Sequence, residues 1–297
     1  MRFSQLLCIS VLLVSCSQEK DLDLLTIYTS RQPQLIEPLL EQYKEKTGIE
    51  VRLLSGKAPQ LMERIAVESD ITEADIFMTV DAGVLWQAGE KGILEDINSK
   101  ILNENIPEHL RDASGKWFGL SKRARTIVYN SDKVSADELS SYKDLADPKW
   151  ANKLCLRTST KVYNRSLIAS MIDADGYENT KKIVQGWVNN LATEVFSSDT
   201  QVLKAVSAGQ CNVTIVNTYY LARLADDPTY SNLKLHWANQ DGRGTHVNIS
   251  GAGVTRYSKN KVEATKLLEW LSSAEAQEIY AGANKEFPVM DGIDVGQ

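Results

Sequence analysis

The chain has 297 residues, of which 43% are hydrophobic and 24% charged, values typical of a soluble globular protein with one large domain or two ordinary ones. This composition excludes a disordered, collagen-like or coiled-coil chain. The chain has 39 acidic and 33 basic residues and a net charge of −6 at pH 7, which argues against nucleic acid as a partner.

Residues 1–15 predict a signal peptide. Arg2 precedes an apolar run that has signal-peptide proportions and is too short to span a membrane. Leu13-Val14-Ser15-Cys16 resembles a bacterial lipobox, which implies cleavage before Cys16, lipid attachment to it and a polar tether over 16–23. An ordinary signal peptide cut near Cys16 is the alternative. We therefore expect a protein of the periplasm or cell envelope that touches a bacterial membrane only through its lipid.

Strands and helices alternate along the mature chain. The first series is a strand over Leu24–Tyr28, a helix over Gln34–Lys46, a strand over Ile49–Leu54, a helix over Ala58–Glu68, a strand over Asp75–Val80 and a helix over Asp81–Glu90. The second series has strands over Lys153–Arg157, Asn212–Val216 and Leu233–Trp237 and helices over Tyr163–Ile172, Asn179–Leu191, Thr200–Ala208 and Thr218–Leu224, and helices over Lys261–Ser272 and Ala274–Ala281 close the chain. This order predicts an α/β fold with two lobes, each a mixed sheet flanked by helices, and a ligand cleft between them.

Each expected lobe is built from two separate stretches of the chain. We assign 24–127 and 247–283 to the first lobe, and 128–246 and 284–297 to the second. Extended segments near Lys116–Tyr129 and His246–Val254 would join the two. The glycines of Ser250-Gly251-Ala252-Gly253 do not fit a phosphate-binding loop, so tight packing of the crossover strands explains them better.

Two cysteines remain after export, because Cys8 leaves with the signal peptide and Cys16 is expected to carry lipid. Cys155 and Cys211 both stand near predicted strand starts. An even pair in an oxidising compartment favours a disulfide. A catalytic thiol or a metal ligand is a weaker interpretation, since neither cysteine has another Cys or a His at metal-binding spacing.

Three tyrosines stand where a predicted strand becomes a helix. Tyr219 and Tyr220 are adjacent at one such junction, and Tyr163 is at another in the same half of the chain. The pair alone is better explained by one core and one surface phenol. Because junctions of parallel strands share one sheet edge, all three hydroxyls can meet there. Three phenolate oxygens suit a hard cation and balance the charge of Fe³⁺.

Seven segments that span nearly the whole mature chain carry a family resemblance. They are IYTSRQP (27–33), ADIFMTVDAGVLWQA (74–88), KRARTIVYNSDKV (122–134), ADPKWANKLCLRTS (146–159), VYNRSLIASMI (162–172), AVSAGQCNVTIVNTYYLARL (205–224) and THVNISGAGV (245–254). The chain resembles the bacterial ferric-ion-binding proteins, substrate-binding subunits of ABC iron importers with the type II periplasmic-binding-protein fold. The resemblance implies lobes that close at a hinge, iron held by Tyr163, Tyr219 and Tyr220, and a permease and an ATPase as partners of a monomer.

One loop departs from the family. Many members have Ser-Arg-His-Tyr where this chain has Ser30-Arg31-Gln32-Pro33, and neither Gln32 nor Pro33 is a good iron ligand. A bidentate anion such as carbonate is then the leading candidate to complete the coordination, as in some relatives. Arg31 would bind it ahead of a helix N-terminus. An interlobe salt bridge is an equal alternative for Arg31.

Further arginines and one histidine are candidates near the iron. Arg223 follows the tyrosine pair by one helical turn, and Arg123 and Arg125 share one face of an extended segment. The family resemblance implies that such arginines line the cleft and lower the pKa of the phenols. A solvated basic edge is the alternative. His246 could approach the cleft, but no histidine has metal-binding spacing.

The predicted function is capture of ferric iron, with Fe²⁺ still open, and its delivery to an ABC importer. An anion, a polyamine or another small organic molecule is the alternative ligand for the same fold. An exported enzyme is less favoured, because the sequence has no GxGxxG after a strand, Walker loop, HExxH or GxSxG motif.

Overall fold

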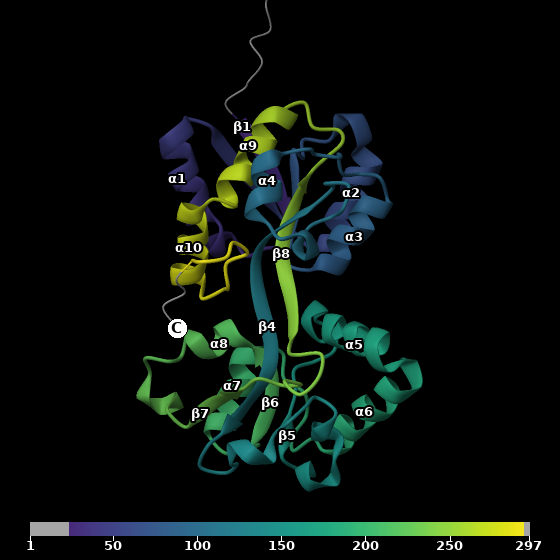
Figure 1. Cartoon of the computed structure of the whole chain (residues 1–297), viewed down its shortest axis with the longest axis vertical. Coiled ribbons are helices and arrows are strands. Elements are labelled where there is room, and N and C mark those ends of the chain that lie inside the picture. The colour runs from purple at the N-terminus through teal and green to yellow at the C-terminus, as the bar shows by residue number, and fades with distance from the viewer. Residues whose placement is uncertain (1–23, 294–297) are drawn as a thin grey trace, which may run out of the picture.

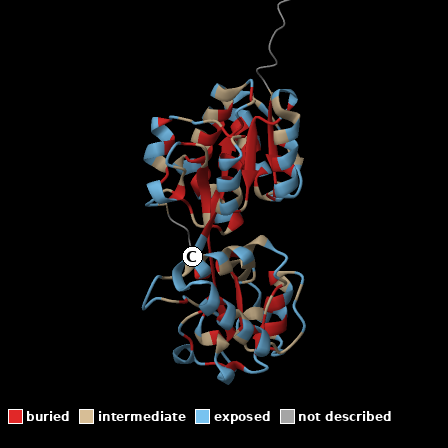
Figure 2. Cartoon of the chain, turned by 90° about the vertical axis from the view of Figure 1, so that its right-hand side faces the viewer, coloured by how far each residue is buried: buried red, intermediate tan, exposed pale blue. Residues whose placement is uncertain are grey.

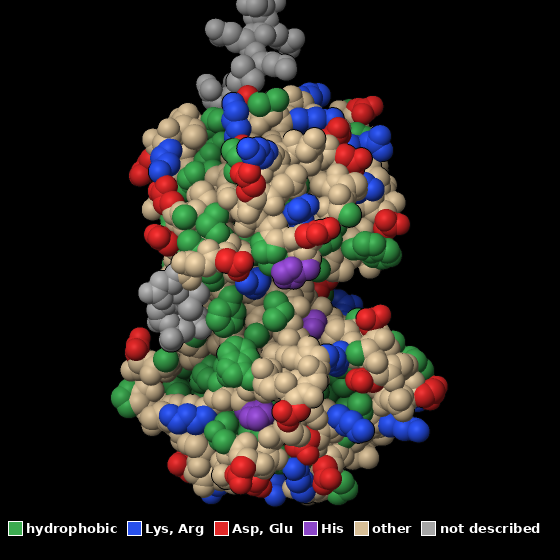
Figure 3. Space-filling model, in the orientation of Figure 1, with side chains coloured by type: hydrophobic (Ala, Val, Ile, Leu, Met, Phe, Trp, Pro, Cys, Tyr) green, Lys and Arg blue, Asp and Glu red, His purple; other side chains and the backbone are tan. Residues whose placement is uncertain are grey.

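The computed structural model describes residues 24–293. The expected signal peptide over 1–15, Cys16 and the tether over 16–23 lie outside the described residues. Two α/β lobes lie one above the other in Figure 1, joined at a narrow waist, and this confirms the two-lobed arrangement. Figure 3 shows the same waist on the surface, with charges of both signs interspersed over the visible face.

One mixed sheet runs through both lobes in the order β2-β1-β3-β8-β4-β6-β5, and β7 pairs with β4. The strands are β1 (Leu24–Thr29), β2 (Glu50–Ser55), β3 (Ile76–Thr79), β4 (Phe118–Asn130), β5 (Leu154–Cys155), β6 (Val213–Asn217), β7 (Leu233–His236) and β8 (His246–Val254). β1 runs parallel to β2 and β3, and β5 runs parallel to β6, whereas β4 and β8 pair antiparallel with all their neighbours.

The lobes are joined by the long strands β4 and β8. These strands pair with each other from Phe118↔Ala252 in the first lobe to Arg125↔His246 near the second. They pass the waist side by side (Figure 1). A Cβ on Gly251 would stand 2.4 Å from the Phe118 carbonyl oxygen, so close strand packing requires this glycine, as the sequence indicates.

Helices cover both faces of each lobe's sheet, and the strands between them are largely buried (Figure 2). Apolar side chains of the sheets and helices form the cores. The helices are α1 (Glu37–Thr47), α2 (Ala58–Glu68), α3 (Ala82–Glu90), α4 (Lys100–Asn105), α5 (Val162–Asp175), α6 (Tyr177–Asn189), α7 (Asp199–Ser207), α8 (Thr218–Ala222), α9 (Lys261–Leu271) and α10 (Ala274–Asn284). Strand β1 shows the alternation expected of a strand buried on both faces, because Leu25 and Ile27 pack beneath α1 and α9 while Tyr28 packs beneath α2. None of the helices between residues 24 and 293 has the length and apolar character needed to cross a bilayer.

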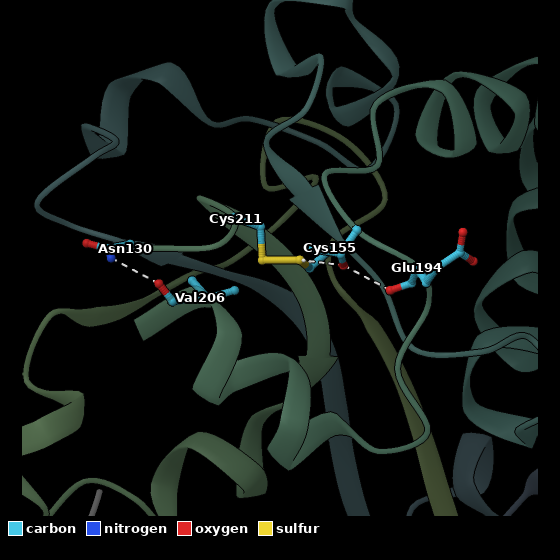
Figure 4. The surroundings of a disulfide bond; sticks show 6 residues. Asn130, Cys155, Glu194, Val206 and Cys211 are labelled. Atoms are coloured by element: carbon cyan, nitrogen blue, oxygen red, sulfur yellow. Dashed lines mark hydrogen bonds between the residues drawn. A yellow bond between two sulfur atoms is a disulfide. The ribbon is translucent and has the colours of Figure 1, made fainter. Parts of the chain in front are cut away.

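The second lobe contains the expected disulfide (Figure 4). Cys155 in β5 and Cys211 just before β6 are bonded, with their Cα atoms 5.8 Å apart. Both sulfurs are buried among apolar residues of α7 and β6. The bond therefore ties the end of the short strand β5 to the segment just before the parallel strand β6.

The C-terminal tail requires a correction. The sequence assigns 284–297 to the second lobe, but Val289 packs in the core of the first, and its N–H donates to Gln277 of α10 at 2.7 Å. Phe287 also pairs with Lys122 of β4. The described tail returns to the first lobe because its apolar residue fits beside α10, although the Phe287 ring faces Trp237 across the waist with centroids 6.4 Å apart.

Candidate metal site

A cavity of about 220 Å³ lies between the lobes. The first lobe lines it with Ser30, Arg31, Gln32, Leu35, Val80, Arg123 and Glu286, and the second with Arg157, Lys161, Tyr163, Tyr219, Tyr220 and Arg223. All three predicted tyrosines therefore face one cavity. No group of three or more His, Cys, Asp and Glu side chains suited to a metal occurs within residues 24–293.

The adjacent tyrosines line the same cavity because the backbone turns between them and the strand. β6 ends at Asn217 and α8 begins at Thr218, so both phenols belong to the first helical turn. Their ring centroids are 4.4 Å apart with the planes inclined by 35°. The Asn217 side chain donates to the Tyr219 hydroxyl at 3.3 Å, which fixes one of the two phenols.

Tyr163 reaches the cavity from the neighbouring junction. It is the second residue of α5, which follows β5 after a short turn. Because β5 and β6 are parallel, with Cys155 paired to Thr214, the helices that follow them start at the same edge of the sheet. The three phenols thus all come from the second lobe.

Cationic side chains surround the phenols. The Arg123 and Arg157 guanidiniums lie over the Tyr163 ring at 5.3 and 5.6 Å from its centroid, and Arg223 lies over Tyr219 at 4.7 Å. At these distances a guanidinium is attracted to the ring face. Positive charge beside a phenol also favours the phenolate.

Burial nevertheless dominates the protonation of the tyrosine pair. Tyr219 is 5% exposed, and burial together with the nearby phenols Tyr163 and Tyr220 raises its pKa well above the ordinary value, against the opposing effect of Arg123. Burial also raises the pKa of Tyr220, while Arg157 acts to lower it. Both phenols are therefore protonated at neutral pH, and the arginines only moderate the effect of burial.

The first-lobe wall is a network of two arginines and one carboxylate. Arg31 donates to Glu286 at 3.0 Å and to the Ser250 hydroxyl at 2.9 Å, and Arg123 donates to the same hydroxyl at 2.7 Å. Burial alone would raise the pKa of Glu286, but Arg31 and Arg123 hold it below its ordinary value. Ser121 donates to the same carboxylate at 2.5 Å.

The hydrogen bonds of this network limit the predicted role of Arg31 as a bidentate anion ligand. Both of its terminal nitrogens already have acceptors. The Nε atoms of Arg31 and Arg123 are buried with no partner among the described residues. The helix after Arg31 is only the 3₁₀ turn Pro33–Leu35, which offers little dipole to an anion.

Arg125 and His246 do not line the cavity. The Arg125 guanidinium is fully buried and donates hydrogen bonds to Asp199 at 3.1 Å and to the Asn217 side chain at 3.2 Å. Since Asn217 in turn donates to the Tyr219 hydroxyl, Arg125 is linked to the tyrosine pair through Asn217. His246 stands at the start of β8, where burial and the charges of Arg125, Arg123 and Arg243 lower its pKa to about 4.

The sequence analysis does not identify three charged residues that line the cavity: Arg157, Lys161 and Glu286. Arg157 forms an ion pair with buried Asp199. It ends the LCLR segment that contains Cys155 and lies six residues before Tyr163. Its position beside this strand–helix junction could have marked it as a candidate in the sequence. Glu286 gives no such signal, because it lies 255 residues from its partner Arg31.

Known proteins resemble this chain along nearly its full length. Residues 28–278 match the family of bacterial extracellular solute-binding proteins. Iron uptake protein A1 of Synechocystis is 42% identical over 97% of this chain and 84% of its own. A Trichodesmium protein (IdiA, FutA), solved in complex with iron and citrate ligands, is 44% identical with a TM-score of 0.84, covering 91% of this chain and 88% of its own.

A ferric binding protein from Campylobacter jejuni superposes equally well, with a TM-score of 0.86, 36% identity and coverage of 91% of this chain and 88% of its own. Each of these relatives exceeds 30% identity over most of both chains. The agreement extends to the type II periplasmic-binding-protein fold. The chain therefore belongs to the bacterial extracellular solute-binding proteins, in the branch of the ferric-ion-binding proteins.

Proposed function

We propose that this protein captures ferric iron outside the cytoplasm with Tyr163, Tyr219 and Tyr220 and delivers it to an ABC importer. The observation that carries the proposal is the meeting of three phenols from two strand–helix junctions in one interlobe cavity. The names of the relatives, iron uptake protein and ferric binding protein, support iron as the cargo.

The chemistry of the donors fits Fe³⁺. Phenolate oxygens are hard ligands, and three of them neutralise a trivalent ion. Fe²⁺ would be bound less strongly, because it would leave one phenolate charge uncompensated. Iron has to displace the phenolic protons, since burial raises the pKa of Tyr219 and Tyr220.

We further propose that an external anion such as carbonate completes the iron coordination. The cavity wall carries five cationic side chains, Arg31, Arg123, Arg157, Lys161 and Arg223. The buried Nε atoms of Arg31 and Arg123 are available donors for the anion. A relative that holds iron together with citrate supports a small carboxylate in this role.

The charges of the cavity wall also distinguish between the alternative ligands. A polyamine would meet five cationic side chains and one carboxylate that is already paired, so the cavity disfavours it. A free anion without iron is the stronger competitor. Mass spectrometry and metal analysis of the purified protein separate these cases.

The family and the predicted signal peptide support a proposal for the cellular setting. We propose that the protein is a monomer, held to a bacterial membrane by lipid on Cys16, which serves an iron permease and its ATPase. Radiolabelled palmitate incorporation into the wild type but not into Cys16→Ala would support the anchor. Equal labelling of the two would contradict it.

The test of the proposed function is the visible spectrum. Purified protein mixed with ferric citrate and bicarbonate should turn coloured through charge transfer from phenolate to iron. Tyr219→Phe and Tyr220→Phe should weaken or abolish the band, whereas Tyr177→Phe, an exposed tyrosine of α6, should leave it unchanged. A colourless wild type, or an unchanged band in both site variants, would refute the proposal.

A further inference from the structure

The cavity has phenols on one side and a single carboxylate on the other. All three tyrosines belong to the second lobe, and Glu286 is the one acidic side chain among the described residues that line the cavity. Gln32, which also faces the cavity from the first lobe, offers only a neutral amide oxygen, and it accepts a hydrogen bond from Gln34 at 2.9 Å. The first lobe therefore has one hard anionic donor to offer a ferric ion.

The Glu286 carboxylate is held through one oxygen. Arg31 and Ser121 both donate to Oε2, at 3.0 and 2.5 Å. No donor within residues 24–293 reaches Oε1. The residue is 3% exposed, so its charge is maintained by the ion pair with Arg31 and by the nearby Arg123, and not by water.

The tail that carries Glu286 already contacts the phenol side. Arg223 donates to the backbone carbonyl of Asn284 at 3.1 Å, and the same guanidinium lies over the Tyr219 ring. Phe287, one residue beyond Glu286, faces Trp237 of the second lobe. Glu286 thus lies in the part of the first lobe that is tied across the waist to the tyrosine pair.

We propose that Glu286 Oε1 is the first lobe's ligand to the ferric ion, in the place left without a ligand by Gln32 and Pro33. This proposal rests on the proposed function. A ligating carboxylate is normally fixed by hydrogen bonds to its other oxygen, and Arg31 and Ser121 supply those here. Arg31 also neutralises the extra negative charge that a fourth anionic donor adds to three phenolates around Fe³⁺.

A purely structural role makes a different prediction. If Glu286 only neutralises Arg31, its replacement by the isosteric amide changes folding stability but not the electronic state of bound iron. If Glu286 binds the metal, its loss leaves the iron more electron-poor, and the phenolate-to-iron band moves to longer wavelength. The position of the band therefore separates a ligand from a stabilising residue.

The variant to test is Glu286→Gln in the full mature protein, with Glu275→Gln as the matched control. Glu275 lies in α10 and forms an exposed ion pair with Lys46. With ferric citrate as the iron source, Glu286→Gln should shift the band to longer wavelength and lower the iron affinity at least about tenfold in competition with citrate. The control should match the wild type. An unchanged band and affinity in Glu286→Gln would overturn the proposal.

A second measurement needs no variant. Iron-minus-apo infrared difference spectra of wild-type protein labelled with ¹³C-glutamate should show a carboxylate stretch that moves on iron binding and carries the isotope shift. The absence of any isotope-sensitive carboxylate change would overturn the ligand role even if Glu286→Gln failed to fold. A wild type without a visible iron band would instead refute the proposed function, so the two failures are distinguishable.

Discussion

Iron loading should release protons from the tyrosine pair. Burial raises the pKa of Tyr219 and Tyr220 above the ordinary phenol value near 10, so both are protonated at pH 7. Removing each proton at pH 7 costs at least about 4 kcal/mol, three pH units at about 1.4 kcal/mol each. If iron binds these phenolates, as proposed, its affinity should fall as the pH falls, by about tenfold per unit for each phenol and about 100-fold for the pair.

Calorimetry in buffers of different ionisation enthalpy counts these protons directly. With ferric nitrilotriacetate as the iron source, Tyr219→Phe and Tyr220→Phe should each release one proton fewer than the wild type. The proton balance of the chelator cancels in this difference. Tyr177→Phe, in which an exposed phenol is lost, should release the same number as the wild type.

Two results would refute the reasoning. One is an equal proton count for the wild type and Tyr219→Phe. The other is a wild-type iron affinity that does not change between pH 6 and 7.5, a measurement that remains possible if the variants bind iron too weakly for calorimetry. Either result would mean that the pair is ionised before iron arrives, or that it does not bind iron.

Three stability predictions follow from buried groups. Burial lowers the pKa of His246 from 6.5 to about 4. Its contribution to the free energy of unfolding is therefore full above pH 6.5 and falls by up to about 3 kcal/mol as the pH drops toward 4. In urea unfolding, His246→Gln should lose less stability than the wild type over that pH range. Asp199→Asn should cost about 3–5 kcal/mol in the same assay, because buried Arg125 and Arg157 lose their shared carboxylate. Replacing both bonded cysteines by serine should lower the free energy of unfolding by about 2–4 kcal/mol, and no change would mean that the disulfide does not form in solution.

Local patterns predicted the elements that hold the phenols. The alternation of strands and helices placed Tyr163 and the 219–220 pair at two junctions, and the structure has α5 beginning at Val162 and α8 at Thr218. The disulfide followed from compartment and cysteine count. These features were accessible because each depends on residues close in the sequence or on a simple rule for parallel strands.

The first-lobe wall could not be predicted in this way. Arg31 and Glu286 meet across 255 residues, and the tail of the chain has no periodic pattern that would assign it to a lobe. The family resemblance drew attention to Gln32 and Pro33, but nothing in the sequence indicated that Glu286 would line the same cavity. The pKa of the phenols was also inaccessible, since it depends on a burial that only the packed lobes create.

The charges of the cavity bear on the form in which iron is bound. Arg157 is paired with Asp199 and Arg31 with Glu286, which leaves Arg123, Lys161 and Arg223 without an acidic partner among residues 24–293. Fe³⁺ with three phenolates is neutral, and it cannot offset those cations. Even with Glu286 on the metal, the cavity retains this positive charge. Lys161 and Arg223 are exposed to solvent, but Arg123 is buried, where a charge without an acidic partner is costly. A bound external anion would reduce that cost, so the charges of the cavity support the proposal that the ferric ion is accompanied by a small carboxylate or carbonate.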